Sequence, residues 1–275
     1  MLISCSLNSC RKLIFLTEGS VDTMNHDDIN ELELLGHNAW VAQERMRIGG
    51  WLLRADHGVT RRANSVLPLG SPGLDINTAI EFAIEFYSSR DIIPRFQVSE
   101  ASLPADLDST LDDRGFSKVF FVEVWTAEIS ALLKLQPSHE TSYLHEISEE
   151  WIDTYLQAST YDPATMSVRK GIMERTDQPH VFVQANGKDL IDSVGFGVAE
   201  GSWLGIFNIA THPDKRKIGA ATAVNHALGL WGSKLGATRA YLQVETNNSI
   251  AKSLYGKLGF AHAYTYWYRQ LDSIK

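Results

Sequence analysis

The sequence has few cysteines and no excess of positive charge, and both absences limit what the protein can be. Its two cysteines, Cys5 and Cys10, lie near the N-terminus, so the body of the chain has no disulfide framework and no cysteine-based zinc site. A formal net charge of -8 argues against general nucleic-acid or membrane-surface binding, because both favour basic patches. We therefore expect a cytoplasmic protein with no metal, no nucleic-acid partner and no membrane partner.

Long hydrophobic runs are also missing. The first 23 residues have only short apolar runs, no basic start and no clear small-residue cleavage site, which fits neither a signal peptide nor a transmembrane helix. A helical pattern begins only after Met24, so we expect 1–23 to be a flexible N-terminal extension. The chain of 275 residues is 44% hydrophobic, enough for one large or two medium domains with a sizeable core.

Strand and helix patterns alternate along the chain and predict a mixed α/β fold, which some schemes class as α+β. The predicted strands are 50–54, 61–66, 95–98, 119–129, 141–147, 181–185, 193–200, 203–211, 240–244 and 264–268. The predicted helices are 29–44, 75–87, 103–113, helical segments within 149–174, 220–235 and a short helix after Asn248.

Three arginines in the first part of the chain, Arg54, Arg61 and Arg62, are candidates for an anion site. Alternation along the predicted strand 61–66 sends Arg61 and Arg62 to opposite faces of the sheet. We therefore favour structural or solvated roles for these arginines over ligand binding.

The strand 203–211 leads into a basic, glycine-containing loop that opens a helix and reads R-K-I-G-A-A from Arg216 to Ala221. Free N–H groups at a helix start, the positive end of the helix dipole and basic side chains together suit a phosphate or pyrophosphate. The alternative is an ordinary strand-to-helix turn with solvated basic residues. Two commoner phosphate motifs, G-x-x-x-x-G-K-[ST] and G-x-G-x-x-G, are absent.

The segments after this loop favour the phosphate interpretation. They are the strand L-Q-V at 242–244 and the stretch N-S-I-A-K-S-L-Y-G-K-L-G-F at 248–260. Together with R-K-I-G-A-A, in this order and at this spacing, they closely resemble the GCN5-related N-acetyltransferase (GNAT) superfamily. The resemblance covers roughly 200–270, and its upstream elements can be traced to about residue 140.

The resemblance implies an acetyl-CoA-dependent N-acetyltransferase. Such an enzyme transfers an acetyl group to a primary amine of a small molecule, amino acid derivative or peptide, by direct attack in a ternary complex. The strand from Asn208 would splay from its neighbour and bind the pantetheine arm, with an N–H near Ile209 for the thioester oxygen; the loop would hold the pyrophosphate, and Asn248 would bond the arm. The implied coenzyme-binding residues are Asn208, Ile209, Ala210, Thr211, Arg216, Lys217, Ile218, Gly219, Ala220, Ala221, Thr222, Asn248 and Tyr255.

The resemblance also makes Tyr255 the acid that protonates the departing sulfur. A tyrosine pKa of roughly 10 lies above the roughly 8.5 of a thiol, so the hydroxyl donates while staying protonated at neutral pH. The alternative is that Tyr255 is one more buried aromatic residue. The general base stays open: Glu245 and Glu200 are candidates, His212 titrates in the right range but lies at the phosphate loop, and the superfamily often uses no dedicated base.

Landmarks recur at a nearly constant offset, pairing Asn64 with Asn208, the Gln-Val at 97 with that at 243, and the Gly-Phe at 115 with that at 259. We interpret this as a tandem duplication, with a degenerate GNAT-like domain at 24–133 and a catalytic domain at 139–275, each built on a mixed, mostly antiparallel sheet flanked by helices.

The first copy has S-P-G-L-D-I at 71–76 in place of the basic loop and Leu111 in place of Tyr255. It should therefore not bind the coenzyme. Other functions that stay open are a non-catalytic acyl-CoA-binding sensory module and a transferase for a longer acyl group. The protein is expected to be a monomer or a homodimer.

Overall fold

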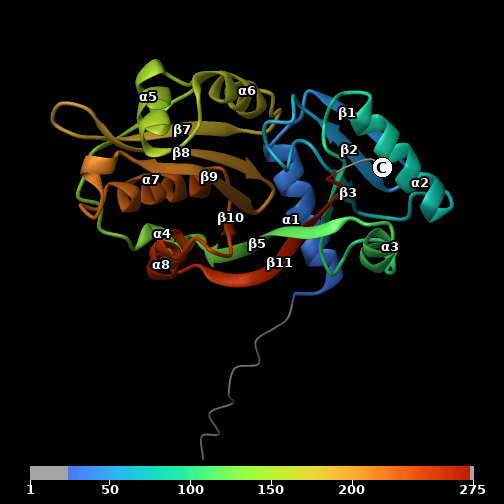
Figure 1. The fold of residues 1–275 in the computed structure, drawn as a ribbon. Helices are drawn as coiled ribbons and strands as arrows, with labels where there is room; N and C mark the ends of the chain where they lie inside the picture. The colour runs from blue at the N-terminus through green and yellow to red at the C-terminus, as the bar shows by residue number, and fades with distance from the viewer. Residues whose placement is uncertain (1–23, 273–275) are drawn as a thin grey trace, which may run out of the picture.

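The computed structural model describes residues 24–272 (Figure 1), so the predicted extension 1–23 lies outside the described residues. None of the helices within 24–272 is long and apolar enough to cross a membrane. The elements of the first half are α1 (His26–Ala39), β1 (Glu44–Ile48), β2 (Trp51–Ala55), β3 (Val66–Pro68), α2 (Ile76–Ser88), β4 (Arg95–Val98), α3 (Leu107–Asp113), β5 (Ser117–Glu128) and α4 (Ile129–Leu133). Those of the second half are β6 (Thr141–Leu144), α5 (Glu149–Ala158), α6 (Pro163–Glu174), β7 (His180–Asn186), β8 (Ile191–Glu200), β9 (Trp203–Thr211), a 3₁₀ turn (Pro213–Lys215), α7 (Ala220–Lys234), β10 (Arg239–Glu245), α8 (Ser249–Lys257) and β11 (Ala261–Gln270).

The strands join into one mixed sheet, in the order β1-β2-β3-β4-β11-β5-β10-β9-β8-β7-β6. The last strand of each half lies between strands of the other half: β11 pairs antiparallel with β4 and β5, and β5 pairs antiparallel with β11 and β10. The mixed α/β sheet with flanking helices is confirmed. In place of one sheet in each half, however, the structure has a single sheet, because the exchanged strands pair the edges that two separate sheets would leave open.

The order of elements in the second half repeats part of the first. The series β3-α2-β4-α3-β5 is matched by β9-α7-β10-α8-β11, and each series contains a parallel pair, β3 with β4 and β9 with β10. Each series ends in the strand that lies between strands of the other half, β5 in the first series and β11 in the second.

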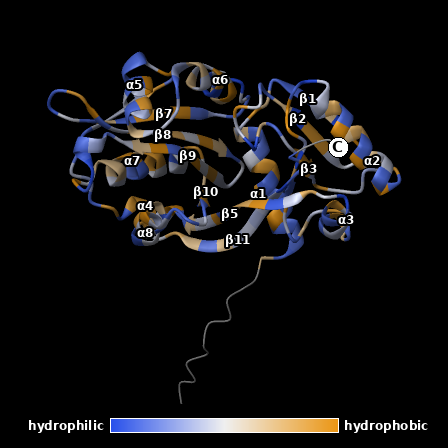
Figure 2. Cartoon of the chain, viewed as in Figure 1, coloured by the Kyte–Doolittle hydropathy of each residue, from blue (hydrophilic) through white to orange (hydrophobic). Residues whose placement is uncertain are grey.

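Helices cover both faces of the sheet (Figure 1). On one face, Trp151 of α5 packs among Phe182 and Phe196 of β7 and β8, whereas Val224 and Leu228 of α7 pack against the opposite face. Helix α1 belongs to the same core cluster as α5, and α2 covers β2–β4 in a separate cluster. Figure 2 shows hydrophobic and hydrophilic segments mixed along the strands, and burial is nearly complete in β2, β8 and the first half of β9.

Several predicted elements differ from the structure, among them the helix 103–113, which begins only at Leu107, and the strand 141–147, which ends at Leu144. The first helix ends at Ala39 instead of continuing to residue 44, where β1 begins. The predicted strand 61–66 is a turn as far as Ser65, because the Asn64 side chain closes the loop: its Oδ1 accepts from Asp56 N (2.7 Å) and Gly58 N (3.0 Å), and its Nδ2 donates to Thr60 O (2.7 Å). These bonds satisfy the loop's backbone locally, so it does not extend the ladder.

Candidate active site

Strands β9 and β10 separate in the middle of the sheet. They are paired from Trp203 with Arg239 as far as Ile206 with Leu242, and no further pairing between them follows among the described residues. The cause is a bulge in β9, where Asn208 has a φ of 52° and the ladder to β8 shifts register. Backbone groups of β9 beyond Ile206 are thus free of β10, so the predicted splaying of the two strands is confirmed.

The loop after β9 ends in an open helix start. Gly219 precedes α7 with a φ of 93° and provides no side-chain cap, and a Cβ added there would meet the Ser138 Oγ at 2.7 Å. Glycine is therefore required both by the backbone conformation and by the space. The corresponding helix of the first half, α2, is capped by Asp75, whose carboxylate accepts from Thr78 N at 3.1 Å. Among the described residues no side chain caps α7, so its first N–H groups are left for another partner, as the predicted pyrophosphate loop requires.

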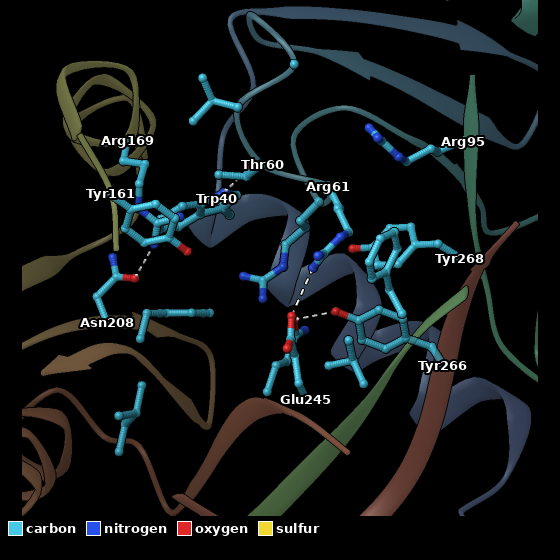
Figure 3. Close-up of a pocket in the computed structure, with 18 of the residues that line it drawn as sticks. Trp40, Thr60, Arg61, Arg95, Tyr161, Arg169, Asn208, Glu245, Tyr266 and Tyr268 are labelled. Carbon is cyan, nitrogen blue, oxygen red and sulfur yellow. Dashed lines mark hydrogen bonds and ion pairs between the residues drawn. The ribbon is translucent and has the colours of Figure 1, made fainter. Parts of the chain in front are cut away.

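A pocket of about 530 Å³ opens where β9 and β10 separate (Figure 3). Both halves of the chain line it, and the lining combines arginines with aromatic rings. The first half contributes Trp40, Gly58, Val59, Thr60, Arg61, Arg62, Arg95, Phe120 and Val122, and the second half contributes Tyr161, Arg169, Ile206, Phe207, Asn208, Gln243, Glu245, Tyr255, Tyr266 and Tyr268.

The structure brings Tyr255 to this pocket. Asn248 caps α8 through its Oδ1, which accepts from Ala251 N at 3.0 Å, and this helix carries Tyr255 to the pocket wall. The ring packs edge-to-face on Phe260 with centroids 5.8 Å apart, and burial raises the pKa of the hydroxyl. Within 24–272 the hydroxyl forms no hydrogen bond, so it is available to a ligand.

The candidate bases are spread apart. Glu245 lines the pocket and forms an ion pair with Arg61 at 2.9 Å, its side chain 51% exposed. Glu200 lies outside the pocket lining, where Asn38 Nδ2 donates to it at 2.9 Å and burial raises its pKa. His212 lies in the loop after β9 and accepts from Asp214 N at 3.3 Å. Of these three residues, only Glu245 shares the pocket with Tyr255.

The side chain of Asn208 is held by Arg169 of helix α6. Helix α6 begins at Pro163 with Asp162 as its cap, which accepts from Thr165 N at 3.0 Å. This helix positions Arg169, whose Nη2 donates to Asn208 Oδ1 at 2.8 Å. Because its side chain is occupied in this way, Asn208 can serve a coenzyme through its backbone.

The three arginines that were candidates for an anion site, Arg54, Arg61 and Arg62, occupy different environments. Arg54 is buried and donates to Ser65 O (3.1 Å) and Gln97 Oε1 (2.9 Å), so its structural role is confirmed. The expectation that Arg61 and Arg62 lie on opposite faces of a sheet is wrong: both line the pocket, because their segment is a turn. Sequence reasoning also missed Arg95 and Arg169, which no local motif marks.

No group of three or more His, Cys, Asp or Glu side chains suited to a metal ion occurs among the residues that the structure describes.

Comparisons with known proteins show the family of the chain. A family model described as "Probable histone acetyltransferase Rv0428c C-terminal" matches residues 26–269. The chain therefore belongs to this family of GNAT-type N-acetyltransferases, and it is an acyltransferase.

Two curated relatives also match most of the chain. The chain is 33% identical over 247 residues to the uncharacterized N-acetyltransferase YobR of Bacillus subtilis, covering 88% of this chain and 98% of that protein. It is 29% identical over 234 residues to the probable histone acetyltransferase Rv0428c of Mycobacterium tuberculosis, covering 84% of this chain and 70% of that protein. Among solved structures, a GCN5-related N-acetyltransferase from Kribbella flavida has a TM-score of 0.65 at 14% identity, covering 89% of this chain and 96% of that one.

Proposed function

We propose that the protein is an acetyl-CoA-dependent N-acetyltransferase that acetylates a primary amine of a small molecule, an amino acid derivative or a peptide. The observation that carries the proposal is the separation of β9 and β10 at the pocket floor, between the open start of α7 and Tyr255. A pantetheine arm lying in this gap has its pyrophosphate at 216–222 and its thioester at the pocket.

The proposed reaction is a direct attack within a ternary complex. The neutral amine nitrogen forms a bond to the thioester carbonyl, the C–S bond breaks, and the thiolate takes a proton from the Tyr255 hydroxyl. A backbone N–H near Ile209 stabilises the negative charge that develops on the carbonyl oxygen. The proton that the amine loses passes to Glu245 or to water, and Tyr255 is reprotonated from solvent.

We further propose that the two halves, 24–133 and 139–275, are copies of one ancestral domain and that the first no longer binds coenzyme. The repeated element order and the two parallel strand pairs support the duplication. The Asp75 cap supports the loss, because a carboxylate occupies the helix start where a phosphate would bind. In this proposal the first half supplies one wall of the acceptor pocket.

Calorimetry with acetyl-CoA tests the binding site. We expect about one site per chain. The double variant Arg216→Glu, Gly219→Asp should lose most of the affinity, while Arg47→Glu, a charge reversal at an exposed position of β1, should keep it. Two equivalent sites, or an unchanged affinity in the double variant, would contradict the proposal.

An amine panel followed by free-thiol release tests the transfer itself. Tight binding of acetyl-CoA without consumption of any amine points to a sensory module instead. Faster turnover of longer acyl-CoA thioesters points to a different acyl donor. Glu245→Gln tests the base: a fall in kcat with unchanged coenzyme affinity supports proton removal by this carboxylate, and an unchanged kcat leaves the step to water.

A further inference from the structure

The pocket has a strong imbalance of charge. Among the described residues that line it are the arginines Arg61, Arg62, Arg95 and Arg169, and the only acid is Glu245. Glu245 pairs with Arg61 at 2.9 Å, which leaves the other three without a carboxylate in the pocket. Figure 3 shows Arg169 with Asn208 at one end and Arg95 with Tyr268 at the other.

The three remaining arginines are held by neutral groups. Arg169 is 7% exposed, donates to the Tyr155 hydroxyl and Asn208, and its guanidinium lies 4.4 Å from the Tyr161 ring centroid. Arg62 lies 5.5 Å from the Phe207 ring centroid, and its Nε is buried without a hydrogen-bond partner among residues 24–272. These contacts hold the side chains in place, and neither Arg62 nor Arg169 forms an ion pair among residues 24–272.

Arg95 has another positive charge nearby. Burial, followed by the nearby positive charge of Arg61, lowers the pKa of its guanidinium. Its Nε donates to the neutral side chain of Gln270, and Asp272 favours its charge without forming an ion pair with it in the described part of the chain. Partly buried cations without a counter-charge are costly, and proteins normally pair them.

Four arginines outside the pocket form such ion pairs. Outside the pocket, Arg90 pairs with Glu44, Arg114 with Glu81, Arg175 with Asp56, and Arg269 with Asp108 and Asp112. Arg54, outside the pocket, is also buried without an ion pair, but Ser65 and Gln97 accept its hydrogen bonds. Arg62 and Arg95 combine the lack of an ion pair with a place in the pocket lining, which indicates that a ligand supplies the negative charge.

We infer that the acceptor carries a carboxylate or phosphate group beside its amine, and that the positive pocket to which Arg62 and Arg95 contribute binds this anion. The inference rests on the proposed function, because it assigns the acceptor to this pocket. The Nη groups of Arg61 and Arg169 already donate to polar partners. The Nη groups of Arg62 and Arg95 have no hydrogen-bond partner among residues 24–272, and such forked donors are suited to a planar or tetrahedral anion. Amino acids and phosphorylated amines satisfy this chemistry, and polyamines or lysine-rich peptides do not.

The same charges assist deprotonation. An ammonium group near several guanidinium groups is disfavoured relative to the neutral amine, so the acceptor reaches its reactive form with little help from a dedicated base. The acceptor's own anion offsets part of the effect at the Arg95 end.

The test compares matched acceptors in free-thiol release with saturating acetyl-CoA. The probes are common L-amino acids, each with its α-amide and its decarboxylated amine, and phosphoethanolamine with ethanolamine. We expect the anionic member of at least one set to exceed its neutral partner by about 10- to 100-fold in kcat/KM, the range for charge-assisted hydrogen bonds. The carboxylate and phosphate sets distinguish the two anions.

The variants Arg62→Gln and Arg95→Gln should each remove this preference through KM for the anionic acceptor while leaving acetyl-CoA affinity unchanged. Arg47→Gln, exposed on β1, is the control. If the glutamine variants fold poorly, Arg62→Lys and Arg95→Lys should weaken the preference in the same direction, because lysine keeps the charge but loses the forked donors. Equal use of neutral amines, or an equal loss for all amines in the variants, overturns the inference and leaves the transferase intact.

If no amine is consumed, thermal shifts with the same probes in the presence of coenzyme A test whether the anion site exists. A rise in Tm with anionic probes that Arg95→Gln and Arg95→Lys reduce or abolish supports the anion site although the proposed transfer has failed. No shift with any anionic probe overturns the inference.

Discussion

Replacing Tyr255 by phenylalanine removes one hydroxyl and little else. The hydroxyl makes no hydrogen bond within 24–272, so its loss leaves no partner unsatisfied, and the edge-to-face contact with Phe260 at 5.8 Å is kept. We therefore expect a change of less than about 1 kcal/mol in the free energy of unfolding, with acetyl-CoA affinity nearly unchanged. The catalytic effect should be much larger.

The proposed role of the hydroxyl is to protonate the departing thiolate. General acid catalysis is typically worth about 10²- to 10⁴-fold, so kcat should fall by that factor, equivalent to about 2.7–5.4 kcal/mol in the activation barrier. Because burial raises the pKa of Tyr255, the hydroxyl stays protonated at neutral pH and its ionisation produces no loss of activity up to pH 10.

Free-thiol release under single-turnover conditions, where chemistry limits the rate, measures the effect. The loss should shrink with a thioester whose thiol is less basic, because such a sulfur needs the proton less. If Tyr255→Phe retains most of its kcat under these conditions, Tyr255 is a packing residue and the proton comes from water.

Three further predictions concern the fold. A fragment of residues 135–275 should be insoluble or inactive, because it lacks β5, which pairs with both β10 and β11; soluble expression with full activity would contradict this. Gly195→Ala should destabilise the protein by about 1–3 kcal/mol in urea unfolding, since the new Cβ would lie 2.6 Å from Ile209 Cδ1 and Val224 Cγ1, whereas Gly256→Ala in α8, with 3.9 Å to its nearest neighbour, should be neutral or stabilising. Hydrogen bonds from Arg269 lower the pKa of Asp108, so Asp108 contributes stability above its unfolded pKa of about 3.9 that is lost as the pH falls; the stability gap between wild type and Asp108→Asn should narrow from pH 7 to pH 3, and a constant gap would refute the assignment.

Local patterns determined most elements of this fold. The strands β4 and β9, the helix α7 and the capped start of α2 follow from hydrophobic periodicity, glycine positions and N-cap residues, which act over a few neighbouring residues. The loop at 216–222 and Tyr255 were also recognisable, because their spacing lies within one continuous stretch of 40 residues, 216–255.

Only the tertiary structure decided how the two halves combine and which residues line the pocket. Strands β5 and β11 pair with strands that are distant in sequence. Their local pattern does not specify these partners, because any antiparallel strand of the right length would satisfy it. Arg62, Arg95 and Arg169 come from three separate segments. The local pattern favoured a structural or solvated role for Arg62 and marked neither Arg95 nor Arg169. Their common charge became visible only when the fold placed them around one cavity, because an unpaired charge is a property of the surroundings in space and not of neighbours along the chain.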